Sequence, residues 1–144
     1  MKYTLSFLLF LLAAATVTVP VRIGGNVRVF VFDTGNAATT LYPAYYELFR
    51  EQVDSCGIED TVRIGGFAGV AENACYRLPS VEFTLEDVPF VLRDIDVLPS
   101  GSAGAMAGSE AGSLGTDFVT AFDVLTVDYE ACRIRGEYRS AADR

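Results

Sequence analysis

The 144-residue sequence contains no histidine and no tryptophan, and cationic side chains are few. Without histidine the chain lacks the base of Ser-His-Asp and Cys-His catalysis and the imidazole ligand of many metal sites. Lysine and arginine together number 11 against 19 acidic residues, which gives a formal net charge of −8. Nucleic-acid binding needs clustered positive charge, so this balance disfavours such a partner. Acid–base chemistry near neutral or acidic pH is therefore left to carboxylates.

Cysteine is also scarce, with only Cys56, Cys75 and Cys132 present. An odd count leaves at least one thiol outside any disulfide. A bond between Cys56 and Cys75 would tie the end of a helix to the base of a hairpin, but sequence alone does not give the connectivity. The three residues are far apart and histidine is absent, so no metal site is expected.

Residues 1–15 have the organisation of a signal peptide. Lys2 supplies a positive head, residues 5–12 are an apolar run too short for a comfortable membrane span, and Ala13-Ala14-Ala15 form a small-residue cleavage pattern. The pattern predicts an exported protein, whether periplasmic, secreted or membrane-associated. An uncleaved N-terminal anchor and a buried strand are the alternatives.

The remaining length allows one domain with a sizeable core, expected over residues 16–138 and followed by a tail at 139–144. Alternating apolar residues predict strands at 16–23 and 27–32, joined at a turn by Gly24-Gly25-Asn26. Pro20 lacks a ladder donor, so the first strand is expected either at a sheet edge or with that position facing outward. A short helix is expected over residues 43–53.

Further short strands are predicted at 61–64, 73–78, 81–85 and 90–98, with a closing hairpin over 124–138. The first two flank a glycine-rich tip, which is typical either of a mobile flap or of an ordinary surface hairpin. Asp94 and Asp96 are expected on one solvated strand face, and residues 99–112 in a loop. The pattern indicates an all-β closed or sandwich-like domain with one or two short helices.

Asp33 ends the second strand and is followed by Thr34 and Gly35. An ionised carboxylate is costly to bury without a partner. Asp33 is therefore either exposed or held by hydrogen bonds for a purpose.

The order of three features resembles that of the retropepsin-like aspartic proteases, especially their bacterial secreted or membrane-associated branch. These features are Asp33-Thr34-Gly35 after an apolar strand, the glycine-tipped hairpin, and the segment 114–118 (LGTDF) before the final hairpin. The match covers about residues 17–137. It implies the retropepsin-like acid protease fold, a closed β-barrel-like domain with a flap hairpin and one or two short helices.

The resemblance also implies an aspartic endopeptidase that needs no cofactor. Two copies of Asp33 in a homodimer would share one proton and activate a water for attack on a peptide bond of a protein or peptide substrate. Thr34 and Gly35 would support the catalytic loop. The residues expected to contact substrate are Asn36, Ala37, Gly65, Gly66, Phe67, Ala68 and Gly69, and the structural second-glycine segment comprises Leu114, Gly115 and Asp117.

The chain departs from the family pattern at several positions. Asn36 stands where Ala or Ser is usual, and Ala37 and Thr116 replace the acid and arginine that pair in retroviral members. Asp117 is a poor second catalytic acid and is expected to cap a helix start. With one Asp-Thr-Gly in the chain, an alternative function is a non-catalytic peptide-binding or dimerisation module on the same fold.

Overall fold

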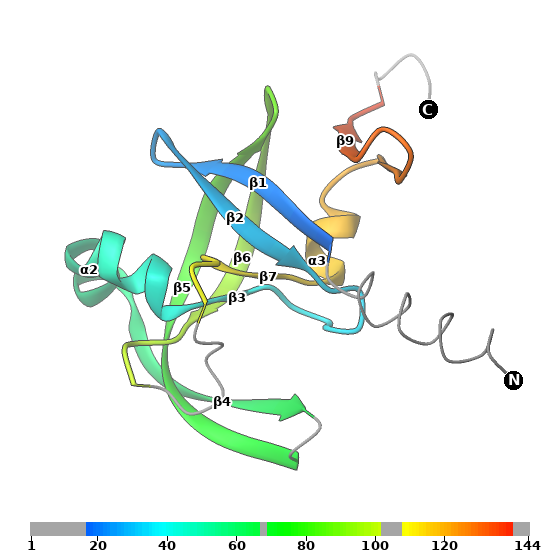
Figure 1. Ribbon diagram of the computed structural model, residues 1–144. Coiled ribbons are helices and arrows are strands. Elements are labelled where there is room, and N and C mark those ends of the chain that lie inside the picture. The colour runs from blue at the N-terminus through cyan, green and yellow to red at the C-terminus, as the bar shows by residue number, and fades with distance from the viewer. Residues whose placement is uncertain (1–16, 67–68, 102–107, 140–144) are drawn as a thin grey trace, which may run out of the picture.

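The computed structural model describes residues 17–66, 69–101 and 108–139 (Figure 1). The predicted leader and the hairpin-tip residues Phe67 and Ala68 lie outside this range. The described elements are β1 (Val17–Ile23), β2 (Asn26–Phe32), β3 (Thr40–Leu41), α2 (Pro43–Cys56), β4 (Ile58–Gly66), β5 (Gly69–Leu85), β6 (Val88–Val97), β7 (Gly112–Leu114), α3 (Thr116–Thr120), β8 (Val124–Asp128) and β9 (Arg133–Glu137).

The first two strands form the predicted hairpin, with Val17 opposite Phe32 and Ile23 opposite Asn26. Gly24 and Gly25 in its turn have φ values of 53° and 81°, a region that glycine enters without a Cβ penalty. The other side of β1 pairs with β5 only at Arg22, so the β1 edge is largely open, as Pro20 predicted. This hairpin leads the chain directly into Asp33.

The strands form a mixed seven-stranded sheet in the order β1-β2-β7-β3-β6-β5-β4, and β8 pairs separately with β9. The mostly β class is confirmed. The expected closed barrel-like form is not confirmed: the sheet bends into a ring in which β1 meets β5 through the single pair Arg22–Thr84. The β4–β5 arm extends away from this ring (Figure 1).

One long strand, β5, replaces two predicted ones. The β5–β6 register passes from Leu78–Ile95 to Ser80–Arg93, so Pro79 and Asp94 lie between consecutive pairs. Proline has no N–H for the ladder, and Asp94 has a φ of 54°, so the pairing is locally irregular but continues beyond it.

Asp96 does not lie on a solvated face as expected. Its Oδ1 accepts a hydrogen bond of 2.9 Å from Arg77 Nε, and Arg77 Nη1 also lies 2.8 Å from Asp60 Oδ2. The Asp96 side chain is only 14% exposed. The arginine thus links β4, β5 and β6 at the base of the arm.

The core is rich in aromatic side chains. Phe83 stacks on Phe90, and the rings of Phe118 and Phe122 lie 5.3 and 5.1 Å from Phe90. Helix α2 adds the buried side chains Tyr45, Tyr46 and Val53. These contacts hold α2 and α3 against the sheet and fix the segments at either side of the candidate site.

The three cysteines are free thiols, so the Cys56–Cys75 disulfide is wrong for this structure. Cys75 lies opposite Asp60, four positions after Cys56. Cys56 is the last residue of α2, before β4 begins at Ile58, so the two cysteines are not cross-strand neighbours. Burial raises the pKa of the Cys75 thiol to about 11, and the Asp96 and Asp60 carboxylates add to the rise.

We expect a thiol reagent at neutral pH to label exposed Cys56 and Cys132 quickly and Cys75 only on unfolding, because the thiolate is the nucleophile.

The raised thiol pKa of Cys75 also stabilises the fold fully below the unfolded value near 9, and this contribution is lost as the pH rises toward about 11. Urea unfolding between pH 8 and 11 checks this loss. A Cys75→Ala variant should show a smaller decline; an equal decline would contradict the assignment.

No helix in the described part of the chain is long and apolar enough to cross a membrane.

Candidate functional site

The sheet brings the two motif segments together. β7 runs parallel to β2, with Phe32 paired to Leu114, and antiparallel to β3. The Asp33 N–H continues this pairing with a 2.9 Å hydrogen bond to the Leu114 carbonyl. The carbonyl of Asn36 accepts the Thr116 N–H at 2.9 Å. Residues about 80 positions apart in the chain therefore form one paired structure.

A partly buried carboxylate joins these segments a second time. Asp117 accepts two hydrogen bonds from Thr39, 2.8 Å from its N–H and 2.7 Å from its hydroxyl, and Thr39 is 1% exposed. The Thr39 hydroxyl in turn accepts the Gly115 N–H at 3.1 Å. Gly115, which makes no side-chain cap, is the N-cap residue of α3. Asp117 Oδ1 also accepts the Phe118 N–H in the first turn of α3 at 2.8 Å, so the carboxylate satisfies a donor at the helix start and in addition links the two segments.

The two segments approach each other closely at Gly115. A Cβ at this position would lie 2.6 Å from the carbonyl carbon of Ala38 and 2.9 Å from the carbonyl oxygen of Asn36. Both atoms belong to the backbone and cannot rotate away. The glycine of the second motif is therefore a steric requirement of this crossing.

The Asp33 carboxylate is partly exposed and has one hydrogen bond on each oxygen. The Gly35 N–H donates to Oδ1 at 2.9 Å, and the side-chain amide of Asn36 donates to Oδ2 at 3.0 Å. Asp33 is therefore both accessible and held, which answers the question that its sequence position raised. These bonds fix the plane of the carboxylate relative to the loop.

Behind this loop lie two residues that the sequence analysis missed. The hydroxyls of Tyr42 and Ser113 are hydrogen-bonded to each other, and Ser113 Oγ lies 3.5 Å from the Asn36 amide nitrogen. Burial raises the pKa of Tyr42; the Ser113 hydrogen bond opposes this rise, and the carboxylates of Asp33 and Glu110 add to it. Tyr42 is consequently neutral at acidic and neutral pH.

A groove of about 210 Å³ lies between this loop and the β4–β5 arm. Three of the predicted substrate-contact residues, Asn36, Ala37 and Gly65, line it together. Figure 1 shows β4 running below the loop that follows β2. The other lining residues are Ala38, Thr40, Tyr42, Val62, Arg63, Ile64, Asp96 and Ser113. Asp33 borders the groove through Asn36 and is not itself a lining residue.

Gly66, Gly69 and Thr34, three of the other predicted site residues, are not lining residues of the groove. Gly66 ends β4 opposite Gly69, which has a φ of 109° at the start of β5. Phe67 and Ala68 lie outside the described residues. Thr34 is exposed at the tip of the Asp33 loop.

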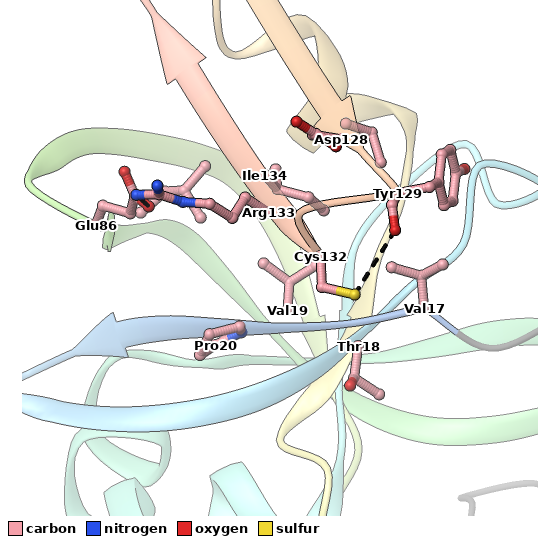
Figure 2. A pocket seen from close by; sticks show the side chains of 12 residues that line it. Val17, Thr18, Val19, Pro20, Glu86, Asp128, Tyr129, Cys132, Arg133 and Ile134 are labelled. Carbon is pink, nitrogen blue, oxygen red and sulfur yellow. Dashed lines mark hydrogen bonds and ion pairs between the residues drawn. The ribbon is translucent and has the colours of Figure 1, made fainter.

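A larger pocket, about 330 Å³, lies between β1 and the β8–β9 hairpin. Figure 2 shows Cys132 between the hairpin and β1, with its thiol 3.7 Å from the Tyr129 carbonyl. Arg133 and Glu86 in its wall lie 3.4 Å apart as an ion pair. None of the predicted site residues lines this mostly apolar pocket, so the groove beside Asp33 is the stronger candidate for chemistry.

Among residues 17–66, 69–101 and 108–139, no group of three or more Cys, Asp and Glu side chains is arranged to hold a metal ion. No protein-family model matches the chain, and a search of curated proteins finds no significant match. The interpretation of the site therefore rests on its own geometry and motifs.

Proposed function

We propose that this chain is an aspartic endopeptidase of the retropepsin-like fold, active as a homodimer. The observation that carries the proposal is the pairing of the Asp33 loop with the Leu114–Asp117 segment beside a groove. The carboxylate there is accessible yet held at both oxygens. A pair of such carboxylates can hydrolyse peptides without histidine, which this chain lacks.

In the proposed reaction, two Asp33 carboxyls lie close together and share one proton, because two like charges at short distance cannot both ionise. The ionised carboxylate removes a proton from water, and the resulting hydroxide attacks the peptide carbonyl. The protonated partner donates a hydrogen bond to the carbonyl oxygen. The carboxyl that took the proton from water then gives it to the amide nitrogen as the C–N bond breaks, and the other carboxyl takes up a proton from the former carbonyl oxygen, so that the pair again shares one proton.

The groove suits an extended peptide. Within the described residues β4 is the last strand of the sheet order and pairs only with β5, so its outer edge keeps unpaired backbone groups beside the groove. An extended segment satisfies such an edge by adding one more strand. Substrates are therefore proposed to be unfolded proteins or extended peptides.

Two chains are needed because each supplies one Asp-Thr-Gly loop. Thr34 and Asp33 lie at the exposed tip of that loop, where a second copy has access to them. Asp117 cannot supply the second acid, since its carboxylate is committed to Thr39. The leader pattern supports export as the proposed location of the enzyme.

The test is a subunit-mixing experiment with an unfolded fluorescent reporter protein at acidic pH. We expect pepstatin-sensitive cleavage whose specific activity falls on dilution. Excess Asp33→Asn chain should suppress the wild-type rate by forming mixed dimers. With equal amounts and random pairing, about one quarter of the dimers contain two intact loops.

The contrary outcomes are distinct. A specific activity independent of dilution and of added Asp33→Asn chain would contradict the dimeric site. A chain that binds the reporter but never cleaves it would support the peptide-binding alternative.

A further inference from the structure

We infer that Asn36, Ser113 and Tyr42 form a positioning relay that holds the Asp33 carboxylate in its working orientation. The inference rests on the proposed function, because the orientation of Asp33 affects a rate only if Asp33 handles the proton of the attacking water.

Asn36 is the central member of the relay. Its side-chain nitrogen lies 3.0 Å from Asp33 Oδ2 and 3.5 Å from Ser113 Oγ. A carboxamide has two N–H hydrogens, so one can serve each acceptor. The partly exposed carboxylate is thereby connected to a serine that is 2% exposed.

Ser113 and Tyr42 give the relay a fixed end. Ser113 lies in β7 between β2 and β3, and its hydroxyl accepts from Asn36, which leaves its own hydrogen for the Tyr42 oxygen. Tyr42 is anchored in turn, since its N–H donates to the Ala111 carbonyl at 2.9 Å. A buried serine between apolar strand residues needs such partners.

The backbone around Asn36 is held without its side chain. Its N–H donates to the Asp33 carbonyl at 3.2 Å, and its carbonyl accepts from Thr116 at 2.9 Å. Asn36→Ala should therefore keep the path of the loop and remove only the side-chain donors to Asp33 Oδ2 and Ser113 Oγ. The carboxylate then keeps the single Gly35 bond and can rotate about its side-chain torsions.

Steady-state kinetics on the reporter provide the first measurement. We expect kcat of Asn36→Ala to fall about 10- to 100-fold, the effect of losing one hydrogen bond to a charged group, with KM nearly unchanged. Ser113→Ala and Tyr42→Phe should lower kcat about 2- to 10-fold, as for a neutral hydrogen bond. Asn36→Ser, which retains a donor, should recover part of the rate.

Asn26→Ala is the matched control. Asn26 is also exposed and also donates through its amide, at 3.3 Å to the Gly24 carbonyl, but it lies at the far end of β2. Its replacement should leave kcat and KM unchanged. A higher KM with unchanged kcat in Asn36→Ala would instead make Asn36 a substrate contact and overturn the relay.

A second measurement does not depend on activity. In ¹⁵N-labelled protein, the side-chain amide signals of Asn36 should shift in Asp33→Asn, Ser113→Ala and Tyr42→Phe, whereas those of Asn26 should not. If the Asn36 side-chain amide signals do not shift in Ser113→Ala, the relay is overturned even in an active enzyme. If the variants show these shifts but the wild-type protein shows no Asp33-dependent cleavage, the proposed function is refuted, and with it the catalytic role of the relay.

Discussion

Replacement of Asp33 by asparagine is expected to lower peptide cleavage by about a thousandfold or more while leaving the protein folded. Acid–base catalysis by a positioned side chain contributes about 10²- to 10⁴-fold, and in a homodimer the substitution removes both carboxyls together. The asparagine carbonyl can still accept the Gly35 N–H that Asp33 Oδ1 accepts at 2.9 Å. Initial rates on the unfolded reporter and a thermal melt measure the two effects separately.

Asp87→Asn is the matched control for this experiment. It makes the same change of charge at an exposed position in the turn between β5 and β6, outside the groove. Its cleavage rate should equal that of wild type. Equal rates for Asp33→Asn and Asp87→Asn, both well above background, would show that Asp33 takes no part in the reaction.

Local sequence signals were sufficient for the parts of this fold that depend on neighbouring residues. The Gly24-Gly25 turn, the alternation of β2 and the closing β8–β9 hairpin all lie where the pattern predicted them. Each is a short-range structure whose turn chemistry and period are visible in the chain. The same local pattern also predicted that Asp33 follows the end of a strand.

Long-range features were not accessible in this way. β3 has two residues, too few for a period, and exists because β6 and β7 lie on either side of it. The partnership of Thr39 with Asp117 spans 78 positions and depends on the β2–β7–β3 crossing. Ser113 and Tyr42 were missed for the same reason, although a serine between apolar strand residues is a signal that it needs a partner. That the Asp33 loop and residues 114–118 belong to one site was expected only from the resemblance to the retropepsin-like proteases.

Replacement of Asp117 by alanine is expected to destabilise the protein by about 3 to 5 kcal/mol. The carboxylate accepts the N–H and the hydroxyl of Thr39, and hydrogen bonds to charged groups contribute about 1.5 to 3 kcal/mol each. Its loss also leaves the buried Thr39 N–H without its acceptor, which adds a desolvation cost. Urea unfolding followed by circular dichroism measures the change.

A double-mutant cycle separates this link from other effects of the substitution. In a Thr39→Val background, where the hydroxyl is already absent, Asp117→Ala should cost less than in wild type, because the two residues share one of the bonds. Asp117→Asn retains one acceptor and should lose about half as much stability as Asp117→Ala.

Since Asp33 reaches its place through the same crossing, cleavage by Asp117→Asn should persist below its melting temperature. Abolished cleavage in folded Asp117→Asn, with stability near that of wild type, would instead assign Asp117 to the chemistry and contradict its role as a link.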